Sequence, residues 1–461
     1  MTDAGIALER SPARAAAAAA RARAPVAALV WTALLGNAVA ILWLWWHGGN
    51  VVGVKTTGEA LTSAARLTGL FAAYVALVQV VLLGRIPWLE RLAGFDRLSV
   101  WHRVLGHATL YLVVAHVVLS VWGYALMDRF TIAKEISTML GGGIYPGMIT
   151  ATIGTALWLV VVASSIAIVR RRLSYEAWYA VHLTAYAAIA LAWFHQIPTG
   201  NELVLDQVAA DYWRALYAAA LALLVVFRVA APIVNAFRFR LHVTNVEHEG
   251  PGVVSLRIAG RNLDRLHARA GQFFLWRFLD RSRWWSAHPY SLSAAPTRTE
   301  LRLTVKALGD HSARLASIRP GTRVLVEGPF GRFTSDVGRR TKKLLIAGGI
   351  GITPIRALLE EIEGDTIVLY RVVDEDEVVF RDELERIAAA RAIDVRVVAG
   401  DHRTPDGARL LSPEHLLELV PDLRARDVYV CGPAGLTDAV ARNARAAGVA
   451  RKDLHAERFA L

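Results

Sequence analysis

Four histidines, His102, His116, His182 and His195, lie in two long apolar segments of the chain. An ionisable side chain in lipid is energetically costly, so it usually has a cofactor, a partner or a path for water. Because an α-helix rises about 1.5 Å per residue, the 14-residue step from His102 to His116 spans about 21 Å of a hydrocarbon core about 30 Å thick. Pairing His102 with His182 and His116 with His195 therefore predicts two stacked haems, one near each leaflet.

An alternative remains for each histidine taken alone, because polar side chains also serve as hydrogen-bond partners between membrane helices. Four histidines at matched depths favour the haem interpretation. The 14-residue step returns to nearly the same helix face, whereas the 13-residue step from His182 to His195 is out of phase on an ideal helix. The second helix must therefore distort, or the two haems differ in azimuth. His107 faces the opposite side and is interpreted as structural.

The elements that must carry these histidines are membrane spans. The chain is 54% hydrophobic, yet its long apolar runs are confined to the first half, and charged, turn-rich sequence fills the second. Each run is long enough to cross a bilayer. The six predicted spans are Val26–Trp46, Leu67–Leu83, Val104–Trp122, Ile149–Val169, Ala177–Phe194 and Ala215–Ile233.

The distribution of charge predicts the orientation of the spans. Basic residues precede the first span and follow the second and fourth, and the positive-inside rule assigns these segments to the cytoplasm. The opposite connections, which carry Glu59, Glu202, Asp206 and Asp211, are assigned outside. We therefore expect a multi-pass cell-membrane protein whose N-terminus and C-terminal half are cytoplasmic. Residues 1–24 are predicted to be a disordered cytoplasmic tail, and residues 25–235 the six-span domain.

The excess of 52 Lys and Arg over 40 Asp and Glu does not indicate nucleic-acid binding. Much of that excess flanks the spans, where anionic lipid headgroups attract it. The chain has a single cysteine, Cys431, which excludes an internal disulfide and disfavours a protein-bound iron–sulfur cluster.

The second half divides near residue 340. Residues 236–340 contain short alternating strands separated by turn residues, a pattern typical of a small antiparallel β-barrel. The strands are expected at Leu241–Val246, Val253–Ile258, Gln272–Phe278, Leu301–Ala307 and Arg323–Glu327. Residues 341–461 alternate strand, glycine turn, helix and strand, which predicts an α/β domain with a parallel sheet.

Two motifs in this α/β domain indicate a nucleotide site. The turn Gly348–Pro354 follows a buried strand, Lys343–Ala347, and precedes a helix at Ile355–Ile362. Its glycines allow the backbone to approach a pyrophosphate, Thr353 is expected to cap the helix, and Pro354 suits the first turn. The strand Val428–Pro433 places Cys431 at the carboxyl edge of the sheet, where ligands bind in open parallel sheets. A buried structural cysteine is the alternative.

Several motifs occur in the order seen in the ferredoxin–NADP reductase superfamily: His288-Pro289-Tyr290-Ser291-Leu292, Gly309-Asp310-His311-Ser312, Gly328-Pro329-Phe330-Gly331, the Gly348–Pro354 turn, Cys431-Gly432-Pro433 and His455–Phe459. Together with Trp101-His102-Arg103, they make the chain resemble the ferric reductase and NADPH oxidase family of transmembrane flavocytochromes b. The resemblance extends over nearly all of residues 65–461.

The resemblance implies roles for particular residues. Tyr290, in the motif with His288 and Pro289, would lie against the FAD isoalloxazine ring and Ser291 near its N5 atom. The FAD pyrophosphate would be held by Gly309, Asp310, His311 and Ser312. NADPH or NADH would be bound by Gly348, Gly349, Gly351, Thr353 and Pro354, with Cys431, Gly432 and Pro433 beside the nicotinamide. Phe459 resembles the aromatic residue that covers the flavin, although ordinary core packing is the alternative. Ser291, Cys431 and Phe459 are thus the candidate catalytic residues.

The expected function follows from what each carrier can do. A nicotinamide gives up a hydride, haem iron accepts single electrons, and a flavin does both. Electrons would pass from cytoplasmic NAD(P)H through FAD to the His102/His182 haem b, then to the His116/His195 haem b, and finally to oxygen or a ferric chelate outside. An electron-relay subunit that supplies a partner protein or quinone is the alternative. Arg371 follows a strand and is expected to contact the 2′-phosphate of NADPH.

Overall fold

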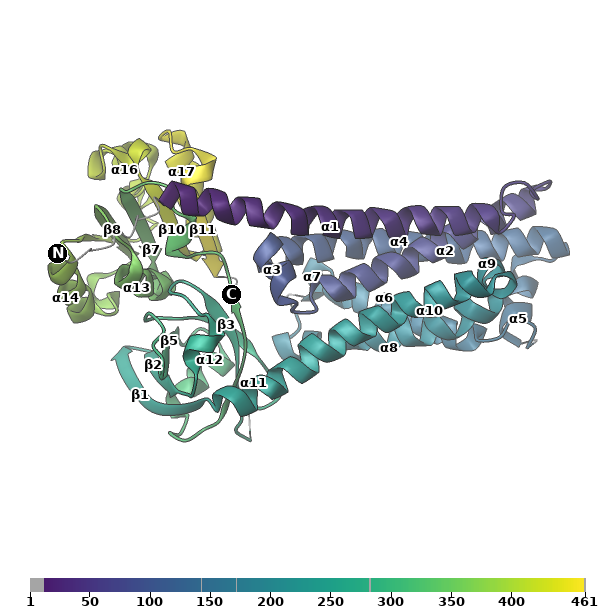
Figure 1. Ribbon diagram of the computed structural model, residues 1–461, viewed down its shortest axis with the longest axis horizontal. Helices are drawn as coiled ribbons and strands as arrows, with labels where there is room; N and C mark the ends of the chain where they lie inside the picture. Colours follow the sequence, from purple (N-terminus) through teal and green to yellow (C-terminus); the bar gives the residue numbers. More distant parts are fainter. Residues whose placement is uncertain (1–11, 142, 171, 282, 460–461) are drawn as a thin grey trace, which may run out of the picture. The chain divides into compact units, whose positions relative to one another are not determined.

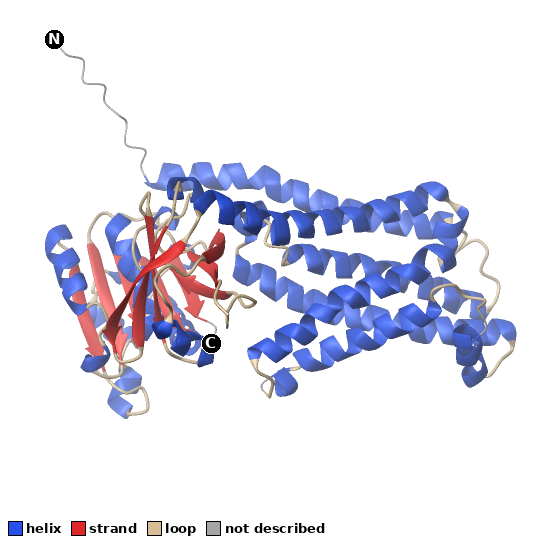
Figure 2. Ribbon diagram, turned by 90° about the horizontal axis from the view of Figure 1, so that it is seen from below, coloured by secondary structure: helices blue, strands red, loops and turns tan. Residues whose placement is uncertain are grey.

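The computed structural model describes residues 12–459 except 142, 171 and 282. It divides into two compact units. The helical unit comprises Val26–Leu89 and Phe95–Ala230, and the main part of the C-terminal unit is Ala231–Leu461. All named strands lie between His242 and Phe459, in the C-terminal unit (Figure 2).

Six helices in the described chain are long and apolar enough to cross a membrane, so the six predicted spans are confirmed (Figure 1). They are α1 (Pro12–His47), α2 (Thr57–Leu82), α4 (Phe95–Asp128), α6 (Met148–Ser165), α8 (Tyr175–Thr199) and α10 (Gln207–Leu224). The sixth span extends beyond α10 through a π-helical segment, Val225–Ala230, into α11 (Ala231–Phe239). Shorter helices connect the spans: α3 (Pro87–Ala93), α5 (Ile132–Gly141), α7 (Ala167–Arg170) and α9 (Asn201–Leu205).

The N-terminal tail differs from its prediction where it is described. Helix α1 begins at Pro12, so residues 12–24 extend the first helix instead of forming an irregular segment. Residues 1–11 of the predicted tail lie outside the described residues.

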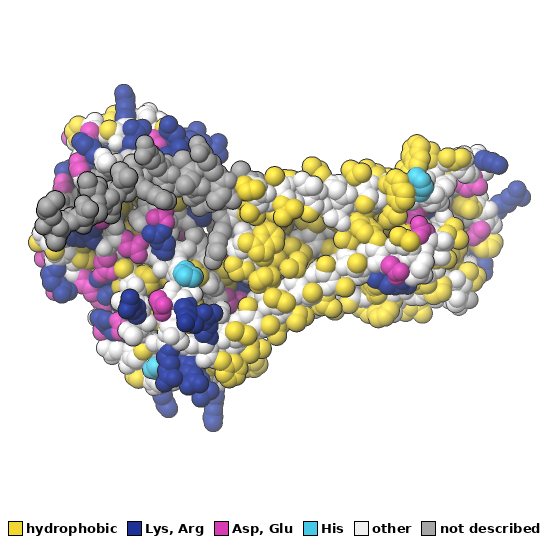
Figure 3. Space-filling view, in the orientation of Figure 1, with side chains coloured by type: hydrophobic (Ala, Val, Ile, Leu, Met, Phe, Trp, Pro, Cys, Tyr) yellow, Lys and Arg dark blue, Asp and Glu magenta, His cyan; other side chains and the backbone are white. Residues whose placement is uncertain are grey.

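Large apolar side chains cover the outside of the helical unit, as expected when lipid is the solvent. Leu29 and Tyr111 are each 69% exposed. Figure 3 shows apolar side chains over the visible face of this unit, whereas the charged side chains gather on the C-terminal unit and at one end of the bundle. Polar side chains cap the starts of α2, α8 and α10, whereas α6 has no side-chain cap. Thr56 and Glu59 form a capping box at α2, and Asp206 accepts from two N–H groups of α10.

Small residues bring the spans into close contact, α2 against α4 and α6 against α8. A Cβ atom on Gly123 of α4 would lie 2.7 Å from the side chain of Thr62 in α2, and one on Gly154 of α6 would lie 2.8 Å from the carbonyl oxygen of Ala188 in α8. These contacts fix the two histidine-bearing helices, α4 and α8, against their neighbours.

The strands of residues 242–330 form two antiparallel sheets of three strands each, in the orders β1-β2-β5 and β4-β3-β6. Single bridges, His242 to Arg323 and Leu292 to Leu303, connect them. The antiparallel strands were predicted correctly, but the pairing does not close into a barrel. The bounds are β1 (His242–Gly250), β2 (Val253–Ala259), β3 (Phe273–Phe278), β4 (His288–Ser291), β5 (Glu300–Lys306) and β6 (Val324–Phe330).

The α/β prediction for the rest of the C-terminal unit is confirmed by a five-stranded parallel sheet in the order β11-β10-β7-β8-β9. Alternate residues of its strands face two cores: Leu345 and Tyr429 face one, and Leu344 and Val428 face the other. The strands are β7 (Lys343–Gly348), β8 (Thr366–Val372), β9 (Asp394–Ala399), β10 (Asp427–Pro433) and β11 (Leu454–Phe459). The helices that cover them include α13 (Ile352–Glu361), α14 (Arg381–Arg391), α16 (Pro413–Leu419) and α17 (Ala434–Ala446).

Candidate functional site

The four span histidines come together in the two predicted pairs. The ring centroids of His102 and His182 are 6.0 Å apart, and those of His116 and His195 are 6.3 Å apart. Two imidazoles that bind one metal ion from opposite sides, with metal–nitrogen distances of about 2.0–2.1 Å, have ring centroids about 6 Å apart. Both pairs therefore have the spacing that a six-coordinate haem iron requires.

Helix α8 forms both pairs as one continuous α-helix despite the 13-residue step between its histidines. The two imidazole planes meet at 54° in the His102/His182 pair and at 35° in the His116/His195 pair. The two pairs thus differ in ring orientation while sharing nearly the same separation.

Backbone carbonyls orient the rings on α4. Nδ1 of His116 lies 2.7 Å from the carbonyl oxygen of Ala65, and Nδ1 of His102 lies 3.1 Å from that of Gln79. Such a bond fixes the ring and leaves Nε2 as the ligating nitrogen. Gly69 makes room for the His116 ring, since a Cβ atom there would lie 2.6 Å from Nδ1.

The donor set also fits haem better than an isolated metal ion. The described residues contain no group of three or more His, Cys, Asp or Glu side chains placed to hold a metal. Two protein ligands suffice where a porphyrin supplies the other four. His107 belongs to neither pair, and its Nδ1 lies 2.8 Å from the carbonyl oxygen of Arg103 within the same helix.

The predicted nucleotide turn lies where β7 meets α13. Gly348 ends the strand, Gly349 has φ +51°, and the helix begins at Ile352. The N-cap is Gly351 rather than Thr353, whose hydroxyl donates to the carbonyl oxygen of Ile350 at 3.0 Å from within the helix. The predicted capping role of Thr353 is therefore wrong, whereas Pro354 lies in the first turn as expected.

The Cys431 motif packs directly against this turn. A Cβ atom on Gly432 would lie 3.1 Å from Cα of Gly348, so the two strand ends approach each other closely. Cys431 is completely buried, and burial raises the pKa of its thiol well above the usual range. Phe459 pairs with Pro433 through the β10–β11 ladder and packs against the core while remaining partly exposed.

The residues expected at the flavin form a stack of rings. His288 stacks on His311 with centroids 3.5 Å apart, and the hydroxyl of Tyr290 lies 3.1 Å from Nδ1 of His311. Burial, followed by the neighbouring His288, Arg283 and Arg314, lowers the pKa of His311 to about 3. Nε2 of His311 is buried and has no hydrogen-bond partner among the described residues. A buried polar atom of this kind requires a partner, which fits a site for a polar cofactor.

The Gly309–Ser312 motif is a strand-to-helix turn that leads into the short helix α12 (Asp310–Ala313). The Ser312 hydroxyl accepts from the N–H groups of Leu308 and Gly309 at 2.9 and 3.0 Å. The turn is thus preformed by its own serine. Ser291 is buried at the end of β4, and Pro289 is exposed.

Arg371 lies beside Gly348 in the β7–β8 ladder, which brings it to the edge of the sheet that carries the glycine turn. Its side chain is only 7% exposed, and its Nη1 donates to the backbone carbonyls of Val372 and Val398. A contact with a 2′-phosphate therefore requires the guanidinium to leave these carbonyls.

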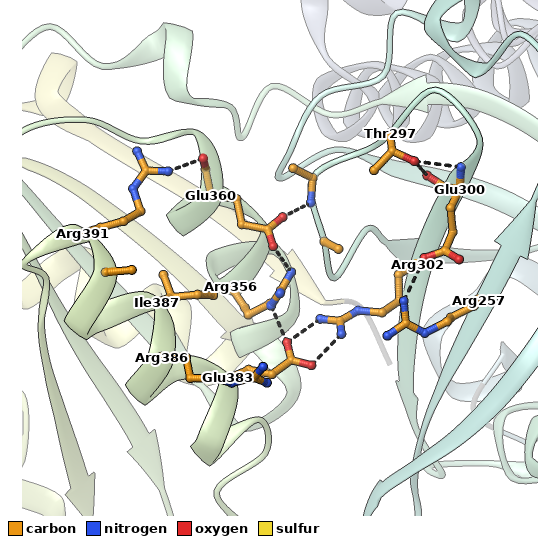
Figure 4. A pocket seen from close by; sticks show the side chains of 13 residues that line it. Arg257, Thr297, Glu300, Arg302, Arg356, Glu360, Glu383, Arg386, Ile387 and Arg391 are labelled. Atoms are coloured by element: carbon orange, nitrogen blue, oxygen red, sulfur yellow. Dashed lines mark hydrogen bonds and ion pairs between the residues drawn. The ribbon is translucent and has the colours of Figure 1, made fainter.

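The sequence prediction missed a cleft of about 600 Å³ in the C-terminal unit (Figure 4). Arg302 from β5, Arg356 from α13 and Glu383 from α14 line it and form ion pairs. Arg302 and Glu383 are 81 residues apart in sequence, so no local motif connects them.

Three family models match consecutive parts of the chain. A ferric reductase like transmembrane component matches residues 68–193, an FAD-binding domain matches residues 238–334, and an oxidoreductase NAD-binding domain matches residues 345–442. The first match contains His102, His116 and His182 and ends two residues before His195. The other two contain the ring stack and the glycine turn.

Known reductases resemble part of the chain. NADH oxidoreductase HCR of Escherichia coli is 29% identical over 47% of this chain and 67% of its own length. Ferredoxin–NADP reductase B of Sorangium cellulosum is 30% identical over 37% of this chain and 77% of its own length. The ferredoxin reductase component of 3-ketosteroid-9-alpha-monooxygenase from Mycolicibacterium smegmatis is 32% identical, and the match spans 57% of its length. Among solved structures, the FAD/NAD-binding domain of nitric oxide dioxygenase from Vibrio cholerae matches with a TM-score of 0.41 and 23% identity, over 48% of this chain and 98% of that domain.

Proposed function

Because the chain belongs to the ferric reductase family of membrane oxidoreductases, with FAD- and NAD-binding domains of the ferredoxin–NADP reductase type, we propose that it carries electrons from NAD(P)H across the membrane. The donor is cytoplasmic NAD(P)H, and the acceptor is an extracytoplasmic molecule, either oxygen, which becomes superoxide, or ferric iron. The single observation that carries this proposal is the pairing of span histidines at 6.0 and 6.3 Å.

The chain's own residues have distinct tasks in this proposal. His102 with His182 would hold one haem b, and His116 with His195 would hold the other. The carbonyls of Gln79 and Ala65 orient the rings of His102 and His116. Tyr290, His288 and His311 bind FAD in the C-terminal unit. The Gly348–Pro354 turn binds the nicotinamide nucleotide. When bound, FAD accepts a hydride and releases single electrons, and haem iron accepts electrons one at a time.

The proposed orientation rests on charge. Arg97, Arg103, Arg170 and Arg172 lie at one side of the spans in sequence order, and Glu59, Glu202 and Asp211 lie at the other. The positive-inside rule assigns the arginine side to the cytoplasm. The C-terminal unit follows the sixth span and is therefore cytoplasmic, together with the NAD(P)H site.

The test uses the full-length protein, purified with its cofactors and reconstituted in sealed vesicles. We expect two low-spin haems and one FAD for each chain. NAD(P)H added on the side of the C-terminal unit should reduce a membrane-impermeant ferric chelate, or oxygen, on the opposite side. One haem per chain, or a high-spin spectrum, would contradict the bis-histidine assignment. Oxidation of NAD(P)H that requires an added protein or quinone would favour the electron-relay alternative.

A further inference from the structure

Two lobes form most of the C-terminal unit, and ion pairs of two buried arginines join them. We call residues 238–334 the FAD lobe and residues 345–442 the NAD lobe, after their family matches. Arg302 of the FAD lobe donates from Nη1 and Nη2 to the two carboxylate oxygens of Glu383 in the NAD lobe, at 2.8 and 2.9 Å. Arg356 also pairs with Glu383, with its Nε 2.7 Å from Oε2 (Figure 4). One carboxylate thus binds an arginine from each lobe.

Both arginines also bind the same carbonyl group. Nη2 of Arg302 and Nη1 of Arg356 donate to the carbonyl oxygen of Ser293, at 2.9 and 3.0 Å. Two residues further along the chain, the N–H of Ala295 donates to Glu360 of α13 at 2.6 Å. The segment 293–295 is therefore fastened to α13 by its backbone.

The contact between Ser293 and Arg356 connects the two proposed cofactor sites, because each residue lies two positions from one of them. Ser293 follows Ser291, the residue expected near the flavin, by two positions. Arg356 follows Pro354, the last residue of the nucleotide turn, also by two positions. A shift of α13 relative to β4 would therefore move the nucleotide turn relative to the flavin site.

The two arginines of the network are buried, and the Glu383 side chain that they share is 20% exposed. Arg302 is 4% exposed and Arg356 is 8% exposed. Burial alone would raise the pKa of Glu383, but the hydrogen bonds and charges of Arg302 and Arg356 outweigh burial and hold it below its usual value. Bidentate arginine–carboxylate pairs fix direction as well as distance. The guanidinium of Arg302 also lies 5.0 Å from the ring centroid of Phe380, at the start of α14.

We propose that Arg302, Arg356 and Glu383 are positioning residues for the reduction of FAD by NAD(P)H. In that reduction a hydride, one proton with two electrons, leaves the nicotinamide and is taken up by the flavin. The three side chains hold the strand end at Ser291 and the nucleotide turn at the separation this transfer needs. The inference rests on the proposed function, because it assumes that both cofactors bind in the C-terminal unit.

The chain offers a matched control between the same lobes. Lys306 of β5 and Glu377 of the NAD lobe form an ion pair of 3.1 Å, but their side chains are 34% and 42% exposed. Exposed pairs contribute little, because water screens them. Glu377→Gln removes this cross-lobe pair without touching the Ser293 carbonyl.

The first experiment measures reduction of FAD by NAD(P)H in a stopped-flow spectrometer, using the purified full-length holoprotein. Glu383→Gln and Arg356→Met should lower the limiting rate constant by about tenfold to a hundredfold, as expected when reacting groups shift by about 1 Å. The FAD content and the Kd for the nucleotide should stay within about twofold of wild type, and Glu377→Gln should change none of the three quantities. Arg356→Lys keeps the charge and should recover part of the rate.

The second experiment measures the lobes directly and needs no turnover. Spin labels are attached through Thr299→Cys and Ala389→Cys, both at exposed positions, while the buried Cys431 stays unlabelled. The distance distribution should broaden in Glu383→Gln and remain narrow in Glu377→Gln.

The outcomes distinguish failure of the positioning role from failure of the proposed function. An unchanged rate and an unchanged distance distribution in both Glu383→Gln and Arg356→Met would overturn the positioning role. Loss of FAD along with the rate would also overturn it, because the network would then merely hold the FAD lobe together. If the wild-type protein binds FAD but no nicotinamide nucleotide reduces it, the proposed function itself is wrong.

Discussion

The backbone of Gly351 lies directly against that of Cys431, so that a Cβ atom at position 351 would lie 2.6 Å from the carbonyl carbon of Cys431. This contact joins the nucleotide turn to the end of β10, and any side chain at position 351 must force the two apart. We therefore expect Gly351→Ala to lower the free energy of unfolding by about 1–3 kcal/mol, the usual cost of overpacking. Binding of NAD(P)H should weaken as well.

The measurement is thermal or denaturant unfolding of the purified protein, combined with nucleotide titration. Gly435→Ala is the control, because a Cβ atom there meets nothing within 4 Å and the position lies in α17. The control should leave both quantities nearly unchanged. Equal behaviour of the two variants would show that position 351 tolerates a side chain.

The second histidine pair can be removed selectively. His116→Ala or His195→Ala should reduce the haem content from two to about one per chain, because each removes one of the two histidines that would hold the second haem. Reduction of an external, membrane-impermeant acceptor should stop, whereas NAD(P)H should still reduce FAD. The haem content is measured from the absorbance of the pyridine complex.

His107→Ala is the matched control, since His107 lies on the same helix but belongs to neither histidine pair. It should keep both haems. A His116→Ala protein that still reduced the external acceptor at the wild-type rate would place the acceptor site elsewhere.

The free energy of unfolding should depend on pH through the lowered pKa of His311. Its pKa is lowered to about 3 in the folded protein, whereas an unfolded histidine titrates near its ordinary value of about 6.5. Between these values the unfolded chain binds more protons than the folded protein, so the free energy of unfolding rises with pH. The stability that the neutral His311 contributes therefore decreases as the pH falls below about 6.5. We expect a shallower loss between pH 6.5 and 4 in His311→Asn. His242→Asn, which changes an exposed histidine of the same unit, should behave like wild type.

Arg371 provides a test of nucleotide preference. If its guanidinium leaves the carbonyls of Val372 and Val398 to bind the 2′-phosphate, Arg371→Ala should raise the Kd for NADPH by about tenfold or more and leave that for NADH unchanged. Calorimetric titration of both nucleotides measures this. An unchanged ratio of the two Kd values would assign Arg371 to the stability of the sheet instead.

The sequence predicted those parts of the fold that depend on local periodicity. The strand expected at Val253–Ile258 is β2, Val253–Ala259, and the strand expected at Lys343–Ala347 is β7, Lys343–Gly348. The four-residue strand β4, which carries Tyr290, was not predicted as a strand, because the exposed Pro289 interrupts any alternating pattern. Sheet closure also escaped prediction, since it depends on which distant strands pair.

In the candidate site, too, the features that depend on local spacing were predicted and the long-range contacts were not. The histidine pairs follow from spacing along two helices, and the glycine turn follows from its place between strand and helix. The stacking of His311 on His288 and the shared carbonyl of Ser293 join residues 23 and 63 positions apart, respectively. Contacts of this kind depend on the tertiary arrangement of loops and helices, which no local pattern encodes.

The network around Ser293 also constrains how this sequence can diverge. Arg302 and Arg356 carry two positive charges, and Glu383 and Glu360 carry two negative ones, so the set is neutral as a whole. Loss of Glu383 leaves the buried Arg302 without the carboxylate that it binds, which lowers the free energy of unfolding. Replacement of the whole set by apolar residues avoids that cost. In descendants of this chain these positions should therefore change together, and an intermediate with only one substitution should be rare.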